Sequence, residues 1–302
     1  MTTVLALLVA LVLDAWLGEP RWLWSRWPHP AVVMGRAVGW LDRRLNSAPA
    51  RHAKGVLAVL VLSLGALALG MAIARLGWFA EALVAAMLLA QRSLVDHVRD
   101  VARALRLSVA EGRMMVRRIV SRNTADMTPD QVARAAIESA AENLSDGVVA
   151  PAFWFLLAGA PGILFYKVIN TADSMIGYRT PHYAEFGWAA ARLDDLLNLI
   201  PARLTALIIA LLGGHLGAWR GILSDARQHR SPNAGWPEAA MARSLDVALS
   251  GPRSYDGQVQ PLAWVNETAR RDIGPAQIDA CIAVMWRVWW VMIGATALLA
   301  IL

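Results

Sequence analysis

The stretch GVLAVLVLSLGALALGMAIA, residues 55–74, contains no charged residue and is bounded by Lys54 and Arg75. As an α-helix it would extend about 30 Å, because each residue adds about 1.5 Å along the axis. This length matches the hydrocarbon core of a bilayer. The stretch therefore predicts a transmembrane helix and makes the chain an integral membrane protein.

The composition of the whole chain agrees with this prediction. Of the 302 residues, 57% are hydrophobic and only 17% are charged, whereas soluble domains carry about a quarter charged residues. The net charge of +6 comes mostly from arginine. We expect it to mark loops that stay in the cytoplasm and not a nucleic-acid surface. Cys281 is the single cysteine, which excludes an intramolecular disulfide and a cysteine metal cluster.

Further apolar segments lie on both sides of this stretch. The expected spans are residues 4–17, 55–74, 78–91, 148–169, 196–219 and 283–302. The fourth is interrupted at residues 159–162, Gly-Ala-Pro-Gly, which break a helix. We expect the chain to turn back there as a hairpin or re-entrant pair. The predicted fold is a single membrane-embedded domain over residues 1–302: an all-α, polytopic bundle with broken helices and cytoplasm-facing polar segments.

Residues 92–147 are polar, contain nine arginines and show helical periodicity. Apolar residues such as Val95, Val98 and Leu105 recur at helical spacing, which predicts that the preceding helix continues beyond the membrane surface. Thr128, Pro129 and Gln131 have the order of a capped helix start.

Three carboxylates follow in the same segment, Glu138, Glu142 and Asp146, at positions i, i+4 and i+8. This spacing would stack them on one helical face, where like charges repel unless a cation lies between them. Oxygen ligands of this kind suit Mg²⁺. The alternative is a solvated acidic face, but the block leads directly into an apolar segment, where ionisable groups are costly.

Two further blocks place polar side chains next to predicted spans. In the first, Asn170, Asp173, Ser174 and Gly177 share one helical face, and the glycine allows close approach of backbone or ligand. In the second, Asp194 and Asn198 are one turn apart, with Arg192 nearby. Hydrogen bonding between helices would also account for such residues, although less well for two blocks in succession.

A fourth block begins with Asp225 and His229, one helical turn apart, and continues with Pro232, Gly235 and Pro237. We expect an irregular but ordered segment there, of the kind that presents polar groups to a ligand. His229 alone is more typical of a structural histidine. The sequence contains no phosphate-binding glycine loop, HExxH or GxGxxG motif, so a nucleotide would have to be held by arginines and a metal.

The blocks ESAAENLSDG (residues 138–147), NTADSMIGY (170–178), FGWAAARLDD (186–195) and SPNAGWPEAA (231–240) occur in one characteristic order. In these motifs the chain resembles the adenosylcobinamide-phosphate synthase (CobD/CbiB) family of cobalamin biosynthesis, over roughly residues 4–260. Two positions depart from the family pattern. Glu19 stands where the family often has Asp, and Ser121-Arg-Asn-Thr124 replaces Gly-Arg-Asp-Thr, so a charge role at Asn123 is in doubt.

The resemblance implies an ATP- and Mg²⁺-dependent ligase of the bacterial inner membrane with an active site that faces the cytoplasm. It would join a carboxylate of adenosylcobyric acid, the corrinoid substrate, to the amine of aminopropanol phosphate, through an acyl phosphate. Expected partners are these two substrates, membrane lipid and other membrane enzymes of late cobalamin assembly.

Site roles follow as hypotheses from the same resemblance. The expected catalytic residues are Glu142, Asn170, Asp173 and Glu238. The expected Mg²⁺ ligands are Glu138, Glu142, Asp146, Asp173 and Asp194. The expected substrate- and phosphate-binding residues are Arg122, Asn143, Ser174, Tyr178, Arg192, Arg227, His229, Asn233 and Trp236.

Two other readings of the residues remain open. Paired acidic blocks at a membrane surface also suit a Mg²⁺-dependent transferase that acts on a diphosphate. Polar groups inside membrane segments also mark ion or solute paths, so a non-catalytic sensor or transport-like protein is the alternative from another class.

Overall fold

A computed structural model of the chain describes residues 1–120, 122–255, 258–260 and 262–302. Most of the described chain is helical and its strands are few and short, which confirms the predicted all-α class. It divides into two compact units. Unit 1 comprises residues 1–90, 146–199 and 293–302, and unit 2 comprises residues 91–145 and 200–292. The expectation of one membrane-embedded domain stays a prediction.

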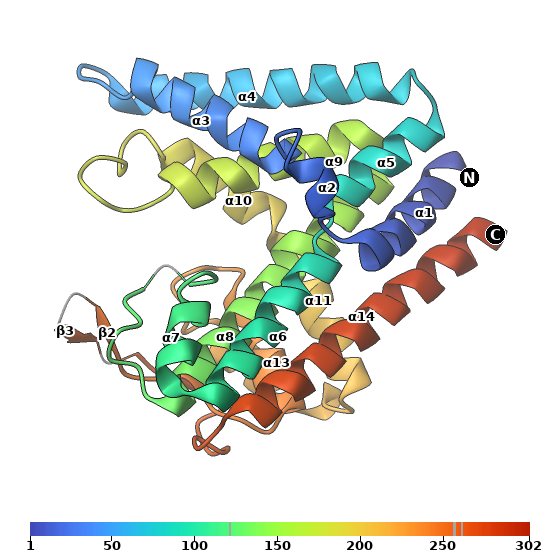
Figure 1. Cartoon of the computed structure of the whole chain (residues 1–302). Coiled ribbons are helices and arrows are strands. Elements are labelled where there is room, and N and C mark those ends of the chain that lie inside the picture. The colour runs from blue at the N-terminus through green and yellow to red at the C-terminus, as the bar shows by residue number, and fades with distance from the viewer. Residues whose placement is uncertain (121, 256–257, 261) are drawn as a thin grey trace. The chain divides into compact units, whose positions relative to one another are not determined.

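Unit 1 contains the helix that decides the fold, α4 (Arg51–Ala74), which includes the whole uncharged stretch. α3 lies beside it (Figure 1). His29 caps the start of α3, because its Nδ1 accepts a hydrogen bond from the Ala31 amide at 3.2 Å. The other helices of the unit are α1 (Thr2–Leu17), α2 (Arg21–Trp24), α3 (Pro30–Leu45), α5 (Trp78–Leu88), α9 (Ala150–Ile176) and α10 (Trp188–Leu197).

The predicted break in the fourth span is present within α9. Gly159 has φ 59°, a left-handed conformation that favours glycine, and Ala158 is also non-helical. The Tyr166 hydroxyl donates a hydrogen bond of 3.1 Å to the Asp146 carbonyl. A straight helix would separate these residues by about 30 Å. The chain therefore turns back at this break, and the predicted hairpin is confirmed.

Unit 2 is built around α6 (Gln91–Leu107) and α8 (Pro129–Leu144), with α7 (Val109–Val116) packed against both (Figure 1). Val95, Val98 and Leu105 of α6 are buried, as their spacing predicted. The predicted start of α8 is also confirmed, because the Gln131 side chain accepts a 2.9 Å hydrogen bond from the Thr128 amide. The other helices of this unit are α12 (Trp219–Ala226), α13 (Gly235–Ser244), most of α14 (Pro275–Ile301) and all but the first residue of α11 (Leu199–Leu212).

Short irregular elements complete the two units. A π-helix, Ser145–Val149, lies between α8 and α9, and a 3₁₀ turn, Leu216–Ala218, precedes α12. In unit 2, β1 (Leu249–Ser250) pairs antiparallel with β4 (Trp264–Val265), and β2 (Arg253–Tyr255) pairs with β3 (Gln258–Gln260). The β1–β4 pair places Ser250 opposite Trp264.

Four helical stretches are long and apolar enough to cross a membrane, Arg51–Ala74, Trp78–Leu107, Pro129–Ile176 and Pro275–Ile301. α10 and α11 form a fifth candidate as a pair bent by 43°. These stretches support a polytopic membrane protein. α1, the predicted first span, has 16 residues and extends only about 24 Å, so it is shorter than the hydrocarbon core.

One local expectation is right only in part. Residues 231–234 form a bend and a turn, as expected for an irregular stretch, but α13 begins at Gly235 and includes Trp236, Pro237 and Glu238. Pro237 lies in the first turn, where its missing amide hydrogen costs no helical hydrogen bond.

Candidate functional site

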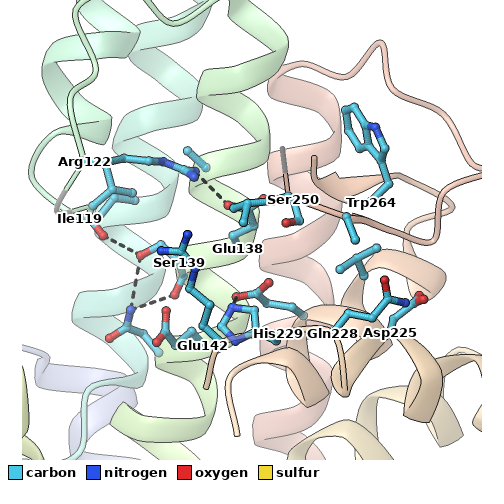
Figure 2. Close-up of a pocket in the computed structure, with 18 residues that line it drawn as sticks. Ile119, Arg122, Glu138, Ser139, Glu142, Asp225, Gln228, His229, Ser250 and Trp264 are labelled. Carbon is cyan, nitrogen blue, oxygen red and sulfur yellow. Dashed lines mark hydrogen bonds and ion pairs between the residues drawn. The ribbon is translucent and has the colours of Figure 1, made fainter. Parts of the chain in front are cut away.

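A polar cavity of about 310 Å³ lies within unit 2. Figure 2 shows side chains from α8, from the end of α12 and from the β1–β4 region converging on it. The charged and strongly polar residues that line it are Arg122, Glu138, Ser139, Glu142, Asn143, Asp225, Gln228, His229, Arg230, Glu238 and Ser250.

Arg122 and Glu138 form an ion pair at one wall of the cavity. Arg122 Nη2 lies 2.9 Å from Glu138 Oε2, and their side chains are only 10% and 7% exposed. Glu138 Oε1 accepts a 2.6 Å hydrogen bond from the Ser250 amide. Both oxygens of this carboxylate are therefore engaged by the protein. Arg122 Nε, in contrast, is buried without a hydrogen-bond partner among the described residues.

A second pair, His229 and Glu238, lies on another wall. His229 Nε2 is 3.6 Å from Glu238 Oε1, and the Glu238 side chain is buried. His229 Nδ1 accepts a hydrogen bond of 3.0 Å from the Ser231 amide. In the neutral ring this leaves the proton on Nε2, facing Glu238. The Ser231 amide therefore holds the ring with Nε2 toward the Glu238 carboxylate.

The neighbouring residues differ in how closely the protein holds them. Asn143 donates a 2.9 Å hydrogen bond to the Ser139 carbonyl, and the Ser139 hydroxyl donates to the Ile119 carbonyl at 2.7 Å. Asp225 is fixed by Arg243 at 2.8 Å. Glu142 projects from the exposed side of α8 toward the cavity. It is therefore the carboxylate of this wall that is best exposed to a ligand.

Unit 1 contains a different kind of polar cluster, centred on Asp194. Asp194 Oδ1 accepts from Asn170 at 3.2 Å, and Oδ2 accepts from Asn198 at 3.0 Å. The Tyr166 hydroxyl donates to Asn198 Oδ1 at 2.9 Å. Tyr166 and Asn198 are almost fully buried. This hydrogen-bonded chain holds the second half of α9 against α10.

Comparison with known proteins gives the family of the chain. The model of the CobD/CbiB proteins matches residues 7–285. The chain belongs to the CobD/CbiB family. A relative from Sinorhizobium sp. and another from Rhizobium meliloti (strain 1021) are each 47% identical, over 100% and 99% of this chain and 99% and 97% of their own lengths. A relative from Brucella suis is 44% identical over 96% of this chain and 95% of its own.

These relatives are each named cobalamin biosynthesis protein CobD. No solved structure matches the chain. The family resemblance read from the sequence motifs is therefore confirmed over nearly the whole chain. Ser121, which begins one of the motifs that depart from the family pattern, lies outside the described residues.

The structure distributes the predicted CobD/CbiB site residues over both units. The cavity of unit 2 brings together Arg122, Glu138, Glu142, Asn143, His229 and Glu238. Asp146, Asn170, Asp173, Ser174, Tyr178, Arg192 and Asp194 belong to unit 1. Among the described residues, no group of three His, Cys, Asp or Glu side chains is arranged to hold a metal ion. The expected stack of three carboxylates also ends at Glu142, because Asp146 lies in the π-helix and does not line the cavity.

Three predicted binding residues lie away from the cavity lining. Asn233 accepts a 3.2 Å hydrogen bond from Arg203, whose guanidinium lies over the Trp236 ring at 4.7 Å. Asn233 and Trp236 are buried, and their two contacts hold the Arg203 side chain in place. Arg227 is exposed and is not a lining residue. Their binding roles stay predictions.

Some lining residues were missed from the sequence. Arg230 and Gln228 flank His229, so they could have been found as neighbours in the same block. Ser250 and Trp264 had no such signal, because only the pairing of two short strands brings them to the cavity. Trp264 is held between the guanidinium groups of Arg134 and Arg271, at 4.7 and 4.4 Å.

Proposed function

We propose that this protein works in cobalamin biosynthesis as an ATP- and Mg²⁺-dependent amide ligase. It would join adenosylcobyric acid to aminopropanol phosphate and yield adenosylcobinamide phosphate, ADP and inorganic phosphate. The observation that carries the proposal is the family match over residues 7–285, together with relatives that share 44–47% identity over the full length.

The chemistry defines what the site must supply. A carboxylate is a poor electrophile, so one of its oxygens would first attack the γ-phosphorus of ATP, releasing ADP and forming an acyl phosphate. The amine nitrogen would then attack the acyl carbon, phosphate would leave, and a base would take the proton lost by nitrogen. Cationic groups are needed for the phosphates, and a base is needed for the amine.

The cavity of unit 2 supports this assignment through its residue types. Arg122 and Arg230 line it as cations, and guanidinium groups bind phosphate oxygens through charge-assisted hydrogen bonds. Glu142 is suited to accept the amine proton. His229 lines the cavity with its Nε2 toward Glu238, so Glu238 would orient the imidazole. Glu238 is thus a positioning residue and does not contact the substrate in this assignment.

The size of the cavity limits what enters it. A volume of about 310 Å³ is at the lower end of the range for ligand sites, which is about 300–1,000 Å³. It suits aminopropanol phosphate with the terminal phosphates of a nucleotide. The corrinoid ring would lie outside, with only the reacting carboxylate reaching in.

The donor set also fits a particular mode of Mg²⁺ binding. Mg²⁺ is commonly held by one or two carboxylates together with substrate phosphates and water. Glu142 is suited to this, and Glu138 less so because Arg122 and Ser250 already engage its oxygens. The bound ion would neutralise charge on the phosphates. The ligand roles of Asp146, Asp173 and Asp194 in unit 1 stay proposals.

The direct test uses the full chain purified in lipid nanodiscs. It is incubated with adenosylcobyric acid, ATP, Mg²⁺ and aminopropanol phosphate, and the products are measured by mass spectrometry. Adenosylcobyric acid labelled with ¹⁸O in its free carboxylate should pass one labelled oxygen to inorganic phosphate. Product without this transfer would contradict the acyl phosphate.

Other results would favour the alternative functions. Corrinoid binding without turnover would favour a sensor or transport-like protein. Release of pyrophosphate from a diphosphate substrate, without formation of ADP, would favour the transferase. An ethanolamine phosphate control defines the amino-alcohol that the site accepts.

A further inference from the structure

An apolar groove of about 290 Å³ lies within unit 1 between α3, α4 and the second half of α9. No charged residue is among those that line it. α3 contributes Val33, Ala37 and Trp40 to it, α4 contributes Val61 and Gly65 among others, and α9 contributes Leu164 and Val168.

The groove opens to the outside of unit 1 along a membrane helix. Trp40 of α3 and Leu69 of α4 line it and are 53% and 55% exposed. α4 is the most hydrophobic of the candidate spans. A groove of this composition along a span would be filled by hydrocarbon and not by water. Its natural occupant is therefore an acyl chain.

One end of the groove is basic on both helices. On α3, Arg44 continues the stripe of Val33, Ala37 and Trp40, because these positions follow at i, i+4, i+7 and i+11. On α4, the same spacing places Lys54 on the face of Val61 and Gly65.

Arg44 is exposed and Lys54 is half-buried, and both lie near the short connection between α3 and α4. Lys54 Nζ donates to the Ser47 carbonyl at 2.8 Å, in an exposed position. Asp42, the acidic residue at this end of α3, lies on the opposite side of the helix from Arg44 and accepts a hydrogen bond from Asn46 at 2.9 Å. The positive charge at the end of the groove is therefore not balanced by this carboxylate.

We propose that the groove is a binding site for one anionic phospholipid of the cytoplasmic leaflet. An acyl chain lies between α3, α4 and α9, and the phosphate of the headgroup contacts Arg44 and Lys54. The leaflet follows from the basic residues in and around the α3–α4 connection, since such residues concentrate on the cytoplasmic side. Basic pockets beside membrane helices on that side are suited to anionic headgroups.

The test uses a glycine of the groove wall. A Cβ added at Gly65 would point into open space, so Gly65→Leu is expected to place its side chain in the groove. Gly294 of α14 also has open space around it and does not line the groove, so Gly294→Leu is the matched control. Both proteins are released from nanodiscs of phosphatidylglycerol and phosphatidylcholine and studied by native mass spectrometry.

The wild type and Gly294→Leu should retain one phosphatidylglycerol, and Gly65→Leu should lose most of it. Arg44→Gln and Lys54→Gln should each reduce the preference for phosphatidylglycerol over phosphatidylcholine by about fivefold, the effect of one basic residue at an anionic surface. Equal lipid retention in Gly65→Leu and the wild type would overturn the proposal. A dimer of the wild type that Gly65→Leu dissociates would overturn it too, because a second copy would then occupy the groove.

Discussion

The cavity of unit 2 and the polar cluster of unit 1 contain similar residues but arrange them differently. In unit 2, charged side chains from three parts of the chain surround open space, and Glu142 lies exposed at its edge. In unit 1, Asp194 accepts hydrogen bonds from Asn170 and Asn198, and the cluster is packed between helices. The difference teaches that a polar block next to a span can serve a ligand or helix packing, and that only the space around it distinguishes the two.

The largest effect is expected from breaking the ion pair at the cavity wall. Arg122→Ala removes the cation that pairs with the buried Glu138 carboxylate, and losing one partner of a buried pair costs about 3–5 kcal/mol of unfolding free energy. We expect a clear fall in melting temperature in detergent and a loss of turnover.

The double variant Arg122→Met with Glu138→Met separates stability from ligand binding. Removing both charges together should restore much of the melting temperature. Turnover should stay low, because the Arg122 guanidinium is lost and only Arg230 of the two lining arginines remains for the phosphates. Wild-type turnover in the double variant would show that the pair is purely structural.

The next effect concerns the exposed carboxylate of the cavity. Glu142→Gln keeps the shape of the side chain and removes its charge, so we expect an unchanged melting temperature. Turnover should fall about 100-fold, within the range for loss of a general base. The Mg²⁺ concentration at half-maximal turnover should also rise. Near wild-type turnover with the same Mg²⁺ dependence would remove Glu142 from the site.

A smaller effect is expected in the unit 1 cluster. Tyr166→Phe removes the hydroxyl that donates to Asn198 and to the Asp146 carbonyl. Buried acceptors left unsatisfied cost about 1–3 kcal/mol, so the melting temperature should fall. Turnover per folded molecule should stay within about threefold, since no ligand contact is lost.

Asp173→Asn tests whether a carboxylate of unit 1 takes part in turnover, which would contradict the contrast between the two units. Asp173 lies close to Gly177, where an added Cβ would come within 2.0 Å of Asp173 Oδ1. If Asp173 of unit 1 binds metal, this variant should lose turnover without loss of stability. That outcome would remove the distinction between the two regions.

Much of the fold could be predicted because its signals are local. The uncharged run before Arg75, the Thr128–Gln131 cap and the Gly-Ala-Pro-Gly break each act within a few residues. The site could be predicted only in part. Helical spacing stacked Asp146 on Glu142, but the π-helix after Leu144 changes the register. The pairing of Arg122 with Glu138 depends on the path of the intervening loop, which periodicity does not contain.

The smallest effect on turnover is expected from Arg227 and Arg230, two arginines of the same block. Both are exposed, but Arg230 lines the cavity and Arg227 does not. Arg230→Gln should raise the KM for ATP about tenfold, the equivalent of one charge-assisted hydrogen bond. Arg227→Gln should leave kcat and KM within about twofold, as is usual for a surface charge. The opposite ranking would restore Arg227 as the phosphate ligand that the sequence predicted, and would place the bound phosphate outside the cavity lining.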